Sequence, residues 1–275
     1  MNQAYINNKK YDVPGTWNEL DKWQLRQIAK IVHSNKPRPM ARILILLILM
    51  RTKVRPWLAF MFLFRMGAMA KYDLLPAGDW VFDECTLTKA ILPKVRSRWR
   101  WLYAPKDGII KDITFIEFIK CETAYLNYRK HFADMQKRTA HLQTLCAILY
   151  RRKEDGKRIK YDDDNLHLYR KDAKGVGNHD MLCTLLWYDG CRNDWKQYFT
   201  EIYREATTEE MTPDDDPTAD VSANGWISSL HMMAGGALYM EQLSYTRAFT
   251  ALYSLNQKLK ENREMAERLE ASKNQ

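Results

Sequence analysis

The chain of 275 residues is long enough to bury a sizeable core without metal or disulfide staples. Its 46% of hydrophobic residues, with only 11 glycines and 9 prolines, exclude disordered, low-complexity and collagen-like classes. The 43 lysines and arginines outnumber the 34 aspartates and glutamates, so the formal net charge is +9. This excess favours a polyanionic partner, or contact between oppositely charged regions of two copies of the chain.

Basic and acidic residues occupy different parts of the chain. No acidic residue occurs in 22–72 or in 85–106, whereas acidic residues gather in 209–220. We therefore predict a basic N-terminal lobe over residues 1–106 and an acidic loop over residues 207–221. The members of this loop expected to contact a basic surface are Asp214, Asp215, Asp216 and Asp220.

Neither the cysteines nor the apolar runs indicate secretion or a membrane span. The five cysteines lack CxxC spacing and no cleavable apolar leader is visible, which indicates reduced thiols and a cytoplasmic setting. The apolar runs 43–50 and 57–64 are shorter than the roughly 20 residues of a spanning helix. We interpret them as buried helices separated by a charged turn. The alternative is a hydrophobic hairpin that dips into a membrane.

Two capping boxes mark expected helix starts. Thr16 and Glu19 have the spacing of such a box, and apolar residues then follow at helical intervals until the prolines of 34–39. Thr114 and Glu117 form the second box, before the clearest helical pattern in the chain. Between the two helices, short extended segments are expected around Trp99–Tyr103.

The middle of the chain predicts a helical body over residues 107–206 with an insertion over residues 156–178. In the insertion, Lys157–Tyr161 and Leu166–Arg170 flank four turn-forming residues, which predicts a small β-hairpin. C-terminal helices are expected over residues 222–275. The whole sequence therefore predicts a mainly α fold, a single α-helical domain of about nine helices with a small β-hairpin insertion.

The C-terminal helices contain a coiled-coil-like repeat. The run 240–270 is predicted as one long helix, in which apolar residues follow steps of three and four, as in a coiled-coil seam with one polar member. The sequence leaves two roles open for this seam: contact between two copies of the chain, or packing within one copy. Its residues are Leu252, Leu255, Leu259, Asn262 and Leu269, with Ala266 before the last.

No motif for catalysis, a metal or a cofactor is apparent in the sequence. GxSxG, HExxH and phosphate-loop motifs do not occur, and the acidic loop has Ala219 where an EF-hand requires glycine. The best grouping of zinc-type ligands matches no short zinc motif, and core cysteines beside polar histidines are the alternative. We predict no enzyme, no metal and no cofactor. That grouping comprises His167, His179, Cys183 and Cys191.

One segment alternates cations with aromatic rings. In an extended strand the cations would share one face and the rings could stack on bases, as in a nucleic-acid site. We favour the competing interpretation, a solvated or protein-contacting edge with Trp99, Trp101 and Tyr103 in the core. The predicted contacts with a partner or a nucleic acid are Lys94, Arg96, Arg98, Trp99, Arg100 and Trp101.

Four landmarks occur in order along the chain: Pro14–Leu20, then Phe115–Phe118 with Tyr125 and Tyr128, then Leu145–Arg151, and last Gly225–Trp226. This order resembles a family of helical proteins encoded in the tail-morphogenesis region of tailed bacteriophages and prophages. The resemblance implies a structural or assembly role without catalysis, in the host cytoplasm during assembly or in the virion. It implies other assembly or virion proteins as partners. The basic segment before Lys106 and the insertion depart from the family pattern.

The sequence thus supports two hypotheses about function. The first is a non-enzymatic assembly protein whose basic lobe meets an acidic surface, on a partner or on the acidic loop of a second copy in a homo-oligomer. The second is a nucleic-acid-binding module that uses the segment 94–103.

Overall fold

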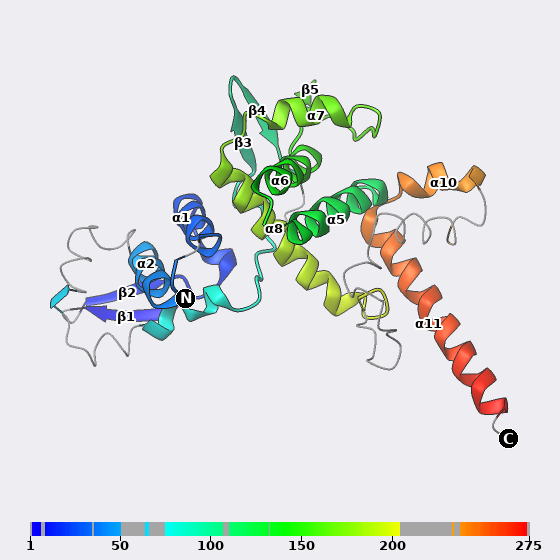
Figure 1. Cartoon of the computed structure of the whole chain (residues 1–275), viewed down its shortest axis with the longest axis horizontal. Helices are drawn as coiled ribbons and strands as arrows, with labels where there is room; N and C mark the ends of the chain where they lie inside the picture. The colour runs from blue at the N-terminus through cyan, green and yellow to red at the C-terminus, as the bar shows by residue number, and fades with distance from the viewer. Residues whose placement is uncertain are drawn as a thin grey trace.

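The structure, a computed structural model, is mainly helical, as the sequence predicts. It describes residues 2–6, 9–34, 36–50, 75–106, 110–131, 133–203 and 237–273, together with 64, 65 and 233. In this part of the chain, helices surround a common hydrophobic core and three small antiparallel hairpins lie at its margins. Figure 1 shows the N-terminal elements at one end, the C-terminal helix at the other, and α8 (Asn178–Tyr198) between them.

The N-terminal part combines one hairpin with short helices. Its strands pair in antiparallel register, and the two α-helices pack on each other. The Gln24 side chain joins these helices because its Nε2 donates a hydrogen bond to the Leu49 carbonyl at 3.0 Å. The elements are β1 (Asn2–Ile6), β2 (Lys9–Val13), the 3-10 helix η1 (Trp17–Glu19), α1 (Lys22–Val32), α2 (Arg38–Met50) and the 3-10 helix η2 (Leu75–Phe82).

The predicted helix start at Thr16 is wrong, because α1 begins six residues later. The Thr16 side chain caps nothing, and the turn after it is only the short η1. Asp21 caps α1 instead, with its Oδ1 accepting hydrogen bonds from the Trp23 and Gln24 amides at 2.7 and 2.8 Å. The Gln24 side chain accepts in return from the Asp21 amide, so the capping box is formed by Asp21 and Gln24.

The apolar run 43–50 is helical, as predicted, and forms the second half of α2. Ile45 and Leu49 are fully buried in the core. The second run, 57–64, lies outside the described residues except for Phe64. Within the described part of the chain, no helix combines the length and the apolar character that crossing a membrane requires.

The central body consists of α5 (Phe115–Lys130), α6 (Met135–Leu149) and α8. The predicted capping box at Thr114 is confirmed, since the Thr114 and Glu117 side chains bind each other's backbone amides. Helix α8 is continuous across Gly190. A side chain at Gly190 would collide with the Leu87 backbone at 2.4 Å, so this glycine permits close contact rather than a break.

The second hairpin lies beside the insertion. The strands β3 (Lys94–Ser97) and β4 (Arg100–Tyr103) pair in antiparallel register, which confirms the extended structure expected near Trp99–Tyr103. The insertion contributes β5 (Lys153–Glu154), β6 (Lys157–Arg158) and α7 (Leu166–Ala173). In Figure 1 this group occupies one edge of the molecule, above α6.

The predicted hairpin of Lys157–Tyr161 with Leu166–Arg170 is wrong. The hairpin in this region is β5–β6, closed by Asp155 and Gly156, whose φ values of 49° and 74° suit a tight two-residue turn. Leu166–Arg170 belongs to α7 instead. The Asp162 carboxylate binds the Asp164 amide at 3.1 Å and so forms the turn that precedes this helix.

The C-terminal helices are α10 (Ala237–Ser244) and α11 (Ala248–Lys273), so the predicted single helix 240–270 is interrupted. The interruption occurs where the segment before α5 pairs with it. The Phe115 amide donates to the Thr246 carbonyl, and the Ala248 amide donates to the Ile113 carbonyl, both at 2.8 Å. The Thr246 carbonyl and the Ala248 amide are thus engaged outside the helices, whereas the Tyr245 and Thr246 amides still bond to Glu241 and Leu243 of α10.

The predicted seam of α11 is divided between core and solvent. Leu252 and Leu255 are fully buried within the chain, and Leu259 is partly buried against the core. Asn262 is exposed and 57% of Leu269 is exposed, on the part of α11 that extends away from the body in Figure 1. Packing within the chain therefore accounts for the first half of the seam.

Candidate functional site

The hairpin β3–β4 presents a basic and aromatic face. Val95 and Leu102 lie opposite each other and are fully buried, which anchors the hairpin to the core. The alternate positions point outward, so Arg96 lies opposite Trp101 and both are exposed. The Lys94 ammonium lies 4.6 Å from the Trp101 ring centre, a cation–π contact that orients the ring.

The tip of this hairpin is a strained turn with an exposed indole. Arg98 and Trp99 connect the paired residues Ser97 and Arg100. Arg98 has a φ of 43°, a left-handed conformation that costs a non-glycine residue roughly 1–2 kcal/mol. The Trp99 side chain is 92% exposed, so the turn holds a large ring in solvent at the end of the hairpin.

The end of α7 braces this tip. The Ser97 hydroxyl donates a hydrogen bond to the Asp172 carbonyl, and the Arg98 amide donates to the Gly175 carbonyl at 3.4 Å. A Cβ atom at Gly175 would lie 2.7 Å from Ser97 Oγ and from Arg98 Cγ. Only glycine therefore allows the loop after α7 to approach the tip so closely.

Further cations surround the hairpin. Lys153 lies with its ammonium 4.4 Å from the Tyr103 ring centre. Residues 94–106 and 151–174 together contain fourteen lysines and arginines against six acidic residues, and so carry +8 of the chain's net charge of +9. Ten exposed cations of these two segments form no ion pair with a described carboxylate: Lys94, Arg96, Arg98, Lys106, Lys153, Lys157, Lys160, Arg170, Lys171 and Lys174.

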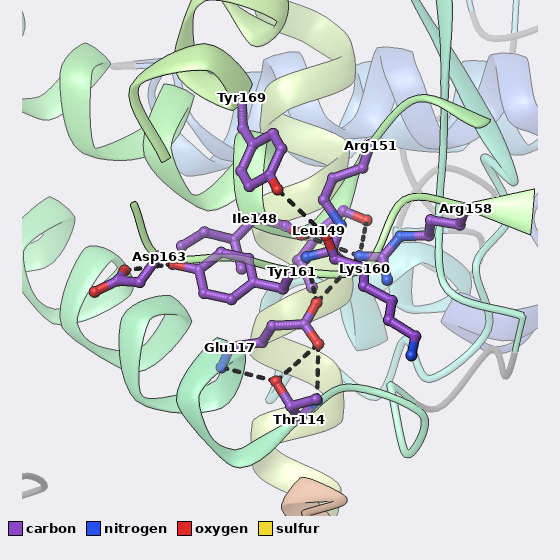
Figure 2. Close-up of polar contacts among 10 residues, drawn as sticks. All are labelled: Thr114, Glu117, Ile148, Leu149, Arg151, Arg158, Lys160, Tyr161, Asp163 and Tyr169. Carbon is purple, nitrogen blue, oxygen red and sulfur yellow. Dashed lines mark hydrogen bonds and ion pairs between the residues drawn. The ribbon is translucent and has the colours of Figure 1, made fainter. Parts of the chain in front are cut away.

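A buried ionic cluster fixes the base of the hairpin. The Tyr103 amide donates to the Arg151 carbonyl at 2.8 Å, and the Arg151 amide donates to the Tyr103 carbonyl at 3.2 Å. The Arg151 guanidinium turns inward, where its Nη1 lies 2.5 Å from Oε1 of Glu117. Figure 2 shows this cluster at the N-terminus of α5, with the rings of Tyr161 and Tyr169 next to Arg151.

A second arginine in the cluster leaves it with an excess positive charge. Arg158 Nη2 lies 3.5 Å from Glu117 Oε1 and donates to the Ile148 and Leu149 carbonyls at 3.0 Å each. These carbonyls belong to the last turn of α6, the negative end of its dipole. Burial, and then the neighbouring Arg151, lower the pKa of Arg158 to about 10. The cluster thus connects α5, α6 and the insertion to the base of the hairpin and holds the hairpin in place.

A separate buried network stabilises the other side of α5. Glu122, which is fully buried, accepts a hydrogen bond from Arg192 Nε at 2.6 Å and one from the Tyr188 hydroxyl at 2.8 Å. The Arg192 guanidinium also lies 5.3 Å from the Tyr125 ring centre and 5.1 Å from that of Tyr203. The carboxylate is fully engaged, which is typical of a structural pair between α5 and α8.

The zinc-type residues and the thiols give no reactive centre in the described part of the chain. No group of three or more histidine, cysteine or acidic side chains there could hold a metal ion. Cys183 and Cys191 are buried in α8, whereas His167 and His179 are exposed. Burial raises the pKa of Cys85, Cys146 and Cys183 to about 12, which keeps these thiols protonated and unreactive at neutral pH.

The structure brings only part of the predicted contact residues to one face, because the segment turns at Arg98 and Trp99 instead of continuing as one strand. Lys94, Arg96 and Trp101 share the outward face, whereas Arg100 pairs with buried Ser97 on the other face. The interpretation that placed Trp99, Trp101 and Tyr103 in the core is wrong for both tryptophans, because Trp99 is exposed and 46% of Trp101 is exposed, whereas Tyr103 is half-buried. In β4 the residue that packs into the core is Leu102. Arg100 is partly engaged with Asp172 at 3.5 Å. The acidic residues Asp214, Asp215, Asp216 and Asp220 lie outside the described residues.

Sequence reasoning missed the groups that hold the hairpin in place. Gly175 was visible only as half of a glycine pair without a phosphate-loop pattern, and its role depends on contact with residues almost 80 positions earlier. The pairing of Tyr103 with Arg151 likewise joins distant segments. The run Arg151–Lys153 was the one available signal of positive charge near the hairpin.

No protein-family model matches this chain, and no curated protein or solved structure matches it either.

Proposed function

We propose that this chain is a non-enzymatic structural or assembly protein of a phage or phage-like particle, associated with the tail. It acts in the host cytoplasm during assembly, or in the virion, by docking on other components. The resemblance of its landmark segments supports the setting. The hairpin β3–β4 supports docking as the mode of action, because it exposes cations and aromatic rings on a hairpin that other elements hold in place.

The observation that carries this proposal is the braced, solvent-exposed tip. Arg98 occupies a left-handed conformation, Gly175 lies against the tip, and Trp99 is almost fully exposed. Exposed indole and guanidinium groups on a preformed element are the side chains that dominate binding energy at protein interfaces. Unpaired cations beside them favour an acidic partner surface.

The experiment reverses charge at the tip with the variant Arg96→Glu/Arg98→Glu, placed in the genome that encodes the chain. The control variant Lys260→Glu/Lys273→Glu changes the same number of exposed cations on α11. We expect normal accumulation of both proteins, and fewer complete tailed particles in electron micrographs for the hairpin variant alone. An unchanged number of particles contradicts the proposal.

A second candidate function, binding of nucleic acid, uses the same hairpin. The exposure of Trp99 favours it, since a ring that is free in solvent can stack on a base. Both candidates require the hairpin as a docking surface and differ in the polyanion that it meets.

A further inference from the structure

We propose that the polyanion bound by the hairpin is single-stranded nucleic acid, with a base stacked on Trp99 and the phosphates held by the surrounding cations. This inference rests on the proposed function, because it takes β3–β4 as the docking surface. It adds the chemical class of the partner and the contacts that bind it.

The surroundings of Trp99 distinguish nucleic acid from a protein partner. Aromatic anchors at protein interfaces lie within a well-packed, water-excluding apolar patch. Around this hairpin, the exposed large hydrophobic side chains of segments 94–106 and 151–174 are Trp99, Trp101 and Leu168, and cations occupy most other exposed positions. A ring surrounded by cations provides the stacking surface and the phosphate contacts that a single strand uses.

The cations are free to contact phosphates. Of the nearby carboxylates, Asp172 is engaged by Arg100 and Arg152, and Asp163 by Lys120. Arg96 and Arg98 at the tip form no ion pair with a described carboxylate and are exposed. In α7 and at its C-cap, the same is true of Arg170, Lys171 and Lys174.

A helix N-terminus adds a second phosphate contact beside the tip. Val176 bridges to Ser97 of the hairpin, and α8 begins two residues later. Gly177 at its N-cap has no side chain to satisfy the free amides, and residues 177–179 are exposed. The positive end of this 21-residue helix therefore faces solvent close to Ser97 and Arg98, and Asp180, the acidic residue of its first turn, is paired with Arg26. This position favours a phosphate.

The geometry favours an unpaired strand over a duplex. Stacking on a side chain requires a base that is not already stacked and paired within a helix. The tip offers one indole ring, main-chain amides and cationic side chains. These groups hold the sugar–phosphate backbone of the nucleic acid without reading base edges. The brace from Gly175 fixes the backbone of the turn that carries Trp99, which lowers the entropic cost of ordering this turn on binding.

The test measures the binding of the full-length protein to three fluorescent probes by anisotropy. They are an oligothymidylate of about 16 nucleotides, a duplex of the same length, and a polyglutamate of similar charge. We expect tightest binding to the oligothymidylate, and an affinity that falls steeply between about 50 and 200 mM salt because counterions are released. Preference for the duplex or the polyglutamate overturns the inference.

Two matched variants test the stacking contact. Trp99→Ala removes an exposed ring and should weaken oligothymidylate binding by about tenfold or more, whereas Trp99→Phe should restore most of it. Tyr253→Ala removes another exposed ring, on α11, and should have no effect. Because Trp99 makes little contact with the core, all three variants should keep the thermal stability of the wild type. Equal affinity of Trp99→Ala and wild type overturns the inference.

The results separate this inference from the function on which it rests. If polyglutamate binds through Trp99 and Arg98 but oligothymidylate does not, the docking surface stands and the nucleic-acid partner is wrong. If Arg96→Glu/Arg98→Glu changes neither probe binding nor particle number, both proposals are wrong. If oligothymidylate binding is lost and particle number falls together, both are supported.

Discussion

Glu117 and Arg151 form a buried ion pair in which Oε1 and Nη1 are 2.5 Å apart and both side chains are almost completely excluded from solvent. The main chain of Arg151 pairs at the same time with Tyr103 of β4. The ion pair thus connects the start of α5 with the base of the exposed hairpin. Its integrity should determine both the stability of the body and the rigidity of the hairpin.

Replacement of Glu117 should destabilise the protein strongly. Glu117→Gln keeps the shape of the side chain but leaves the Arg151 and Arg158 guanidiniums buried without a carboxylate, which should cost about 3–5 kcal/mol in the free energy of unfolding. Thermal denaturation measures this loss, and hydrogen exchange should show faster exchange of the Tyr103 amide. Glu154→Gln, at an exposed position, should change stability by less than about 0.5 kcal/mol. A wild-type melting temperature for Glu117→Gln would show that the pair is dispensable.

Two glycine substitutions should differ in their effect on stability. In Gly190→Ala, the new Cβ would lie 2.4 Å from the Leu87 main chain, which cannot move aside as a flexible side chain can. We expect a loss of about 3 kcal/mol or more in the free energy of unfolding, measured in denaturant. Gly177→Ala meets no atom within 4 Å and should cost less than about 1 kcal/mol. Similar losses for both variants would contradict the close packing of α8 on Leu87.

The two halves of the α11 seam should respond differently to truncation of leucine. Leu252→Ala creates a cavity in the core and should cost about 2–5 kcal/mol. Leu269→Ala acts at an exposed position and should change the stability of the isolated chain by less than about 0.5 kcal/mol. Thermal denaturation at two protein concentrations, with light-scattering mass, tests this. A concentration-dependent loss in Leu269→Ala would show that the outer half of the seam joins two copies.

His33 should make stability depend on pH in the acidic range. Burial, and then the nearby Arg138, lower its pKa from 6.5 to about 4. Between these values the unfolded chain binds a proton that the folded chain does not. The contribution of His33 is therefore complete above pH 6.5 and is lost as the pH falls toward about 4, by at most about 3 kcal/mol.

The variant His33→Phe isolates this effect. Its melting temperature should fall less than that of the wild type when the pH is lowered through this window, because it has no ring nitrogen to protonate. His167→Gln, at an exposed position, should follow the wild type. If His33→Phe and the wild type lose the same stability on acidification, other groups govern the acid response.

The sequence by itself determined the helical class, the second capping box and the extended segment near Trp99, because these depend on neighbours a few residues apart. It misplaced the first helix start, since Asp21 and Gln24 formed a competing box within the same stretch. It misplaced the hairpin of the insertion in the same way, because Asp155 and Gly156 closed a tighter turn than the one predicted.

Only the tertiary structure decided which residues of the basic segment are exposed and how they are held. Alternation alone allows either face of β4 to be buried, and the choice of Leu102 over Trp101 depends on the core that Val95 and Leu102 meet. The bracing of Arg98 by Gly175 and of Tyr103 by Arg151 joins segments about 50 to 80 residues apart. Contacts over such separations leave no periodic trace in a sequence, because they are set by the packing of whole elements.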